Sequence, residues 1–576
     1  MVGRKASSPA TFASTDGNPS MAGFARRVSR LAVRVALGAL GALGALVGFA
    51  AGPTLARAQG HAHPASEGLG ELHFATSCRP AVAPGFDRAV ALLHSFEFSQ
   101  AIAAFDRVLA GDSTCAMAAW GIALSRWTNP FVAGARSSTQ LQGGREAAAR
   151  AARLAAGATD RERGYIAAVA RLYDDFEHVG QRDRILAYEG AMRTLVSQQP
   201  ADTEAAIFHA LALAASAPPA DKSYARQLEA AQTLEALVRV QPRHPGLQHY
   251  LIHSYDVPAL AARGLHAAEQ YATVAPSAAH ALHMPSHIFT RVGAWDASIA
   301  TNLKSIETAR RGGSIAEALH ASDYAMYAYL QTGRDRAARG LLRRLPALAR
   351  RFDANAIGGA APGSAGVFAL AAIPARFALE RRAWAEAAAL VPTASAWPWT
   401  ESLTLLTRAL GAAHTGDLRR AREARDSLGA IHLRLVAARE DYWAEQVAIE
   451  QLEAAAWLAF AEHRTDDALA AMREASTREA ATEKSAVTPG PLAPASELLG
   501  DLLLATGRSA EARAAYEATL VREPNRFRAL YGAMRAASLA GDAGGAARHA
   551  TRLLELCAKA DPKGRPALAE ARRLAR

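Results

Sequence analysis

Apolar residues recur every three or four positions along most of this chain, and Ala, Arg and Glu fill many of the positions between them. Residues 92–113, LLHSFEFSQAIAAFDRVLAGDS, show the pattern. This spacing places the apolar side chains on one face of an α-helix. Alternating runs rich in Val, Ile and Thr, which would indicate β-strands, are nearly absent from the sequence. The pattern therefore predicts an all-α fold.

The chain has 576 residues, more than one hydrophobic core normally serves, so we expect several domains or one elongated repeat array. A period of 34 residues separates Gly507 from Gly541. Small and bulky apolar residues and a proline follow Gly507: Ala512, Tyr516, Leu520 and Pro524. This arrangement resembles the tetratricopeptide repeat (TPR), a hairpin of two helices. The resemblance implies an α-α superhelical solenoid of TPR-like helical hairpins, about nine or ten in this chain.

The first 58 residues have the layout of a secretory signal peptide. Four arginines precede the apolar run LGALGALGALVGFAAG: Arg26, Arg27, Arg30 and Arg34. Ala56-Arg57-Ala58 then matches a small-x-small cleavage site. The apolar run is short for a membrane span. We therefore expect an exported protein, periplasmic or secreted, with no membrane span after cleavage.

Changes in composition divide the rest of the chain. Residues 59–82 are expected to form a flexible N-terminus of the mature protein, and 83–351 an N-terminal TPR-like array with a His-rich segment. A Gly/Ala-rich stretch, 352–366, predicts a hinge loop before a C-terminal TPR array over 367–576. Within that array, residues 482–494 contain a Pro-Gly-Pro run that no helix interior accepts, which predicts a second long loop. Long loops in compact proteins often carry function.

Charge and motifs exclude several classes of function. The net charge is +11 for the whole chain and about +5 without residues 1–58, which carry seven Lys or Arg and one Asp. The sequence has no basic stripe with interleaved aromatic residues, so we expect no nucleic-acid partner. It also lacks a Gly-rich phosphate loop, a nucleophile elbow, HExxH and CxxC. No catalytic residue is predicted.

Three cysteines are present, and two of them flank the first helical hairpin. In an exported protein, a disulfide between Cys78 and Cys115 is the natural interpretation. The alternative is two buried free thiols. Cys557 lies on an apolar helix face and is expected to belong to the core.

Histidines gather in one segment, since residues 244–287 contain seven of the 18 in the chain. His249 and His253 are four residues apart, so they share a helix face. A following helix carries three histidines on one face, although Pro285 should kink it. In a TPR array two such helices lie about 8–10 Å apart on the concave surface. Imidazoles on adjacent helices can meet one Zn, Cu or Ni ion. The predicted ligands are His249, His253, His280, His283 and His287.

Four further residues are expected to contribute groove contacts or outer-shell hydrogen bonds to this site: His209, Asp256, His320 and Asp323. Two other interpretations of the histidines remain open. They could contact a peptide in the groove without a metal. They could also be structural and cap carbonyl groups freed by Pro258 and Pro285. His94 has no obvious partner and is expected to be structural.

Four stretches resemble a group of exported bacterial TPR proteins: LLHSF, TCAMAAWG, HALHMPSHIFTRVGAWD and EKSAVTPGP. The resemblance covers the mature chain, and HMPSHIF, residues 283–289, is its distinctive block. It implies a scaffold of the kind usually assigned to protein–protein interaction, and it supplies no ligand residues. The leading hypothesis is an exported scaffold that binds a protein or peptide partner on its concave face, with a possible transition-metal site. The alternative is a metal-dependent, hydrolase-like enzyme that uses the same histidines, with Asp256 or Asp323 as base or outer-shell group.

Overall fold

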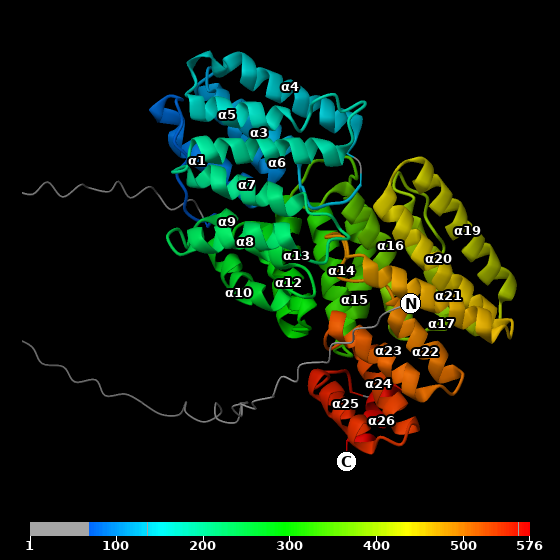
Figure 1. The fold of residues 1–576 in the computed structure, drawn as a ribbon. Helices are drawn as coiled ribbons and strands as arrows, with labels where there is room; N and C mark the ends of the chain where they lie inside the picture. Colours follow the sequence, from blue (N-terminus) through cyan, green and yellow to red (C-terminus); the bar gives the residue numbers. More distant parts are fainter. Residues whose placement is uncertain (1–67, 135, 563, 576) are drawn as a thin grey trace, which may run out of the picture. The chain divides into compact units, whose positions relative to one another are not determined.

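Helix follows helix along the described chain, with no strand among the residues that the structure describes (Figure 1). The computed structural model describes residues 68–576 apart from 135, 563 and 576. These residues form 26 α-helices and three short 3-10 helices. The all-α prediction is therefore confirmed. The predicted signal peptide, residues 1–58, lies outside the described residues.

The bounds of the elements are as follows. The first third contains η1 (Pro80–Val82), α1 (Ala83–His94), α2 (Phe98–Gly111), α3 (Ala116–Trp127), α4 (Ser138–Leu154), η2 (Ala155–Gly157), α5 (Asp160–Ala170), α6 (Gln181–Gln198), α7 (Thr203–Ala215) and α8 (Ala225–Val238). The middle contains α9 (Pro245–Tyr255), η3 (Ala261–Gly264), α10 (Leu265–Val274), α11 (Ala279–His283), α12 (Pro285–Arg291), α13 (Trp295–Gly312), α14 (Ile315–Gln331), α15 (Asp335–Ala349), α16 (Gly363–Leu379) and α17 (Trp384–Ala389). The last part contains α18 (Trp399–Thr415), α19 (Leu418–Ala437), α20 (Asp441–Ala461), α21 (Thr465–Ala481), α22 (Ala495–Ala505), α23 (Ser509–Arg522), α24 (Phe527–Leu539), α25 (Ala543–Leu556) and α26 (Pro566–Leu574).

Most helices pack against the next helix along the chain, and alternate helices also lie side by side, as α14, α16, α18 and α20 do. The predicted turn glycines Gly507 and Gly541 have φ angles of +77° and +79°, which glycine adopts without strain. A Cβ atom at Gly532 would lie 2.3 Å from the Tyr516 ring, so helices α23 and α24 approach closely because this residue has no side chain. Small residues at fixed positions therefore allow the hairpins to pack.

The last helices of the chain fold back onto α13, α14 and α15. The indole Nε1 of Trp295 donates to the carbonyl of Asn525 at 2.9 Å. The backbone N–H of Phe527 donates to Oε1 of Gln331 at 2.8 Å. Arg565 and Asp335 form an ion pair at 2.7 Å. The described residues from 68 onward form one compact unit, in which α14 of the first predicted array packs against α16 of the second.

The loops differ in part from expectation. Residues 68–82 fall in the predicted flexible N-terminus, but Leu69 and Phe74 are buried in the core there. The predicted hinge loop, 352–366, is shorter, because α16 begins at Gly363. The loop predicted over 482–494 is confirmed, since it fills the interval between α21 and α22. Among the described helices, none combines the length and apolar character that crossing a membrane requires.

The predicted pairing of Cys78 with Cys115 is found as a disulfide, with the two Cα atoms 4.9 Å apart. Cys115 precedes α3, and the bridge ties this helix to the extended segment before η1. Cys557 is buried and free, as expected for a core residue.

Replacing both bridged cysteines, Cys78→Ser with Cys115→Ser, is expected to lower the free energy of unfolding by about 3–4 kcal/mol, because the bridge closes a loop of 37 residues. Denaturant unfolding of the oxidised protein and of the variant measures this difference. Thiol titration of the denatured wild type, without reductant, should find one free thiol per chain, that of Cys557. Three free thiols would contradict the pairing.

Candidate metal centre

The histidines come from four helices that meet in the interior. Helix α9 carries His249 and His253, α11 carries His280 and His283, α12 carries His287, and α14 carries His320. Helix α9 begins at Pro245, where proline is well tolerated, and the His244 ring caps it by accepting from the N–H of Gly246. The sequence thus determines where this helix begins, and one turn separates its two site histidines.

Pro285 interrupts the second histidine helix, as predicted. The helix divides into α11, which ends at His283, and α12, which begins at Pro285. Side chains of α13 satisfy carbonyl groups in α11, since Thr301 donates to the carbonyl of Leu282 and Ser305 to that of Ala279. Pro285 leaves the carbonyl of Ala281 without its helical donor. No histidine ring of the described chain has a hydrogen bond to that carbonyl; the carbonyl that a site histidine does contact is that of His94.

All six imidazoles are buried, with exposed fractions between 0% and 8%. We expected these rings on the concave surface of the array, and the structure places their side chains in the interior. The five predicted ligands also do not form one group. They divide into a first triad, His249, His253 and His280, and a second triad, His283, His287 and His320. Within each triad the possible ligand atoms lie within 4.8 Å of one another.

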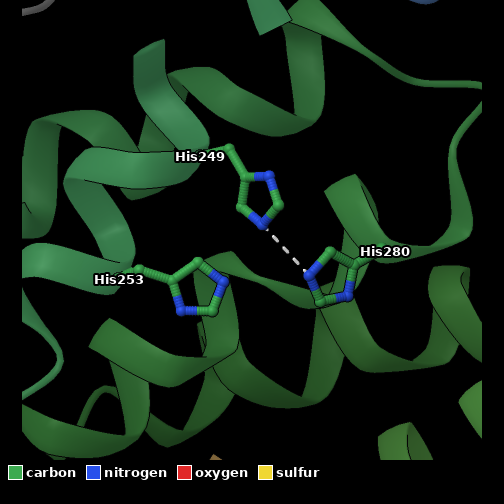
Figure 2. A group of neighbouring side chains, drawn as sticks. All are labelled: His249, His253 and His280. Carbon is green, nitrogen blue, oxygen red and sulfur yellow. Dashed lines mark hydrogen bonds between the residues drawn. The ribbon is translucent and has the colours of Figure 1, made fainter. Parts of the chain in front are cut away.

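The first triad brings rings from α9 and α11 together (Figure 2). The Nε2 atoms of His249 and His280 lie 3.1 Å apart. On the other side of each ring, Nδ1 of His249 donates to the carbonyl of His94 at 2.6 Å, and Nδ1 of His280 lies 3.1 Å from Oε1 of Glu317. His253 stacks on Phe131 and its Nε2 has no hydrogen-bond partner.

The second triad repeats this geometry. The Nε2 atoms of His283 and His287 lie 3.1 Å apart. Nδ1 of His283 donates to Oδ1 of Asn302 at 2.7 Å, and Nδ1 of His287 donates to Oδ2 of Asp256 at 2.8 Å. The ring of His320 lies 4.5 Å from that of His283, and its Nδ1 has no hydrogen-bond partner. Each triad therefore contains one buried ring nitrogen that nothing in the described protein satisfies.

The tautomers of the second triad follow from its partners. The amide Nδ2 of Asn302 donates to the carbonyl of Ser298 at 2.7 Å, so Oδ1 must be the atom facing His283. The carboxylate of Asp256 is likewise an acceptor. Both rings therefore carry their proton on Nδ1, and two Nε2 lone pairs face each other. A neutral pair in this state has no proton to share, whereas a cation between the lone pairs would satisfy both.

Charges around Asp256 keep it ionised. Burial alone would raise its pKa, but Lys484, Arg291 and His287 hold the pKa of this carboxyl well below its usual range. Nζ of Lys484 lies 3.1 Å from Oδ2, and Nε of Arg291 lies 2.9 Å from Oδ1. Asp256 therefore acts as a fixed acceptor for His287.

Burial keeps the histidines neutral. It is the largest cause that lowers the pKa of each of the six imidazoles, and the pKa of His283 falls to about 3. For five of them a neighbouring imidazole lowers the pKa further. At His287 the carboxylate of Asp256 opposes the shift. Neutral rings each retain a lone pair, which is the form that binds metal ions.

A third cluster, His94, Glu204 and His244, has ligand spacing but different chemistry. The two rings bond to the two oxygens of Glu204, at 3.0 Å and 2.9 Å. Their other nitrogens bond to the hydroxyl of Tyr250 and the N–H of Gly246. Every ring nitrogen is satisfied, so this cluster is a hydrogen-bonded part of the core, and His94 has the structural role expected of it.

Of the other three residues predicted to lie beside the metal ligands, one belongs to a triad and two are bound elsewhere. His320 belongs to the second triad itself. Asp323 forms a buried ion pair with Arg376, and Nε2 of His209 lies 2.9 Å from Glu189, so neither contacts a triad histidine. Sequence reasoning missed Glu317 and Asn302, which orient His280 and His283. Glu317 lies one helical turn before His320, which was a usable signal, whereas nothing local marks Asn302.

Loops cover the histidines on one side. A cavity of about 10 Å³, room for about one water molecule, lies between the triads. Both loops singled out in the sequence line it, through Ala360, Ala361, Ala486 and Val487. Arg376 fixes the second loop, since its guanidinium donates to the carbonyls of Gly490 and Pro491 at 2.7 Å and 3.0 Å. Loop 482–494 is therefore anchored above the site.

Arg376→Met should lower the free energy of unfolding by about 3–5 kcal/mol, because it leaves Asp323 buried and unpaired. Arg419→Met, which removes an exposed ion pair with Glu423, should cost about 0–1 kcal/mol. Adding Asp323→Leu to Arg376→Met should recover part of the loss, since no buried charge then remains. Denaturant unfolding of the wild type, the two single variants and the double variant measures these differences. Equal losses of stability for Arg376→Met and Arg419→Met would contradict a stabilising role of the buried Arg376–Asp323 pair.

Sequence comparisons find no matching family model and no matching curated protein. Among solved structures, the chain is similar to a human IFIT1 dimer with PPP-AAAA, at a TM-score of 0.34 and 11% identity over 82% of this chain and 89% of that chain. A monomeric IFIT1 mutant with Gppp-AAAA gives a TM-score of 0.36 and 12% identity over 81% and 95%. Likeness at this level supports no argument, and the site must be interpreted from its own geometry.

Proposed function

We propose that this protein is a metalloprotein that binds two transition-metal ions, one in each histidine triad. The observation that carries the proposal is the pair of Nε2 atoms 3.1 Å apart in each triad, with the opposite nitrogen of each ring bonded to an oxygen. At metal–nitrogen distances of about 2.0–2.1 Å, this separation corresponds to an angle of about 100° at the ion. Tetrahedral and octahedral centres both lie near this angle. The unsatisfied nitrogens of His253 and His320 supply a third ligand for each ion.

The donor set favours the late first-row metals. Three neutral imidazoles per ion, with no thiolate and no carboxylate ligand, suit Zn, Cu, Ni or Fe rather than Mg or Ca. Among divalent ions the affinity of such a site is highest for Cu. Met284 lies in the wall of the shared cavity, and its thioether is compatible with copper.

The site geometry argues against the hydrolase hypothesis and leaves the partner-binding hypothesis untested. A hydrolase with Asp256 or Asp323 as its base is not favoured, because Asp256 is bound to Lys484 and Arg291 and Asp323 to Arg376. Partner binding by the helical scaffold stays a prediction. If it occurs, the six buried histidines are not the contact surface, so the metal centre and any partner site are separate features.

Elemental analysis tests the proposal. Protein freed of metal by a chelator and then dialysed against Zn²⁺ or Cu²⁺ should retain about two ions per chain. His283→Ala should retain about one, because only the first triad stays complete. Bound metal should also raise the free energy of unfolding, by about 2.7 kcal/mol per ion when free metal exceeds the Kd of each site a hundredfold.

Two control variants separate specific from general effects. His178 is exposed and lies outside the triads, so His178→Ala should keep the full metal content. Glu204→Gln changes the third cluster and removes no triad ligand, so it should also keep the full metal content. The proposal is refuted if the wild type retains about one ion per chain or fewer, or if His283→Ala retains as much metal as the wild type.

A further inference from the structure

We propose that the two triads form a single dinuclear centre, in which the two ions share one hydroxide ligand derived from water. The inference rests on the proposed function and adds to it. Two ions in separate sites would act independently. Two ions that share a ligand form one chemical unit, and the contacts between the triads favour this second case.

Ring separations between the triads are similar to the longest separations within a triad, whereas the other ring pairs within a triad lie closer, at 4.5–5.0 Å. The ring centroids of His253 and His287 lie 6.2 Å apart, and those of His280 and His283 lie 6.0 Å apart, although each pair belongs to different triads. Inside the first triad, His253 and His280 are 6.3 Å apart. No helix or side-chain layer therefore separates the two groups.

The backbone explains this closeness. His280 and His283 lie one turn apart on α11, so one short helix supplies a ligand to each triad. The break at Pro285 then begins α12, which places His287 with His283 rather than with His280. Helix α11 therefore contributes one histidine to each triad.

A common cavity connects the triads. Its walls include His253 and His280 from the first triad and His287 and His320 from the second. The rest of its described lining is Asn129 and small or apolar residues such as Met284 and Val487. A ligand in this space would therefore touch imidazoles of both triads.

The same walls define the class of ligand. No carboxylate is among the described residues that line the cavity, so the protein itself offers no bridging group there. The space of about 10 Å³ has room for about one water molecule, so a ligand there has a single heavy atom. A bridging hydroxide forms from water, which loses one proton to the solvent while no electron is transferred. Metal ions lower the pKa of bound water enough for this near neutral pH.

Electron paramagnetic resonance of the copper-loaded protein tests the inference, because coupled Cu²⁺ ions lose the spectrum of isolated ions. The wild type should bind two Cu²⁺ per chain by elemental analysis and show loss of the isolated-ion signal, or a half-field line from two nearby spins. His253→Ala and His320→Ala each leave one complete triad. Each should bind one Cu²⁺ and show the full signal of a single isolated ion.

The outcomes separate the inference from the proposed function. Two bound Cu²⁺ whose signal accounts for all the copper, with no half-field line, would show two independent sites and overturn the dinuclear centre alone. One bound ion in the wild type would overturn it as well. No bound copper would overturn the proposed function. The wild-type measurement needs no variant, and circular dichroism of the two variants confirms that each is folded.

Discussion

Hydrogen bonds to the Nδ1 side of four buried imidazoles determine the arrangement of this site. The bonding partners are the carbonyl of His94, the carboxyl groups of Glu317 and Asp256, and the amide oxygen of Asn302. They lie at the end of α1, on α14, at the end of α9 and on α13. Because each bond orients one ring, these helices must pack correctly before the Nε2 atoms can converge. The helical scaffold thus supplies the geometry that histidine spacing alone cannot provide.

The buried hydrogen bonds of the rings depend on charged residues farther from the site. Asp256 must stay ionised in the interior, which requires the positive charges of Arg291 and Lys484. Lys484 belongs to loop 482–494, so the loop that covers the cavity also stabilises the acceptor of His287. The same loop is bound by Arg376, whose charge is balanced by Asp323. A single set of buried ionic contacts therefore joins the histidines to the cover above them.

Local patterns in the sequence predicted the helices, the turn glycines, the Cys78–Cys115 pair and the five helical histidines. They also predicted the loop at 482–494, because proline excludes a helix there. They could not predict how deeply the histidine rings are buried, or how far the rings lie from one another. The TPR resemblance favoured a groove, whereas the structure buries the rings, and the division into two triads depends on how α9, α11 and α14 pack. Glu317 and Asn302 act through tertiary contacts that no spacing encodes, and His320 was assigned a peripheral role for the same reason.

X-ray diffraction from crystals of metal-loaded protein, recorded at the absorption edge of the bound metal, tests the central claim most directly. The account predicts two anomalous peaks in the interior. One should lie between the rings of His249, His253 and His280, and the other between those of His283, His287 and His320. Well-ordered imidazoles with no anomalous peak at either triad, in crystals grown with excess Zn²⁺ or Cu²⁺, would contradict it.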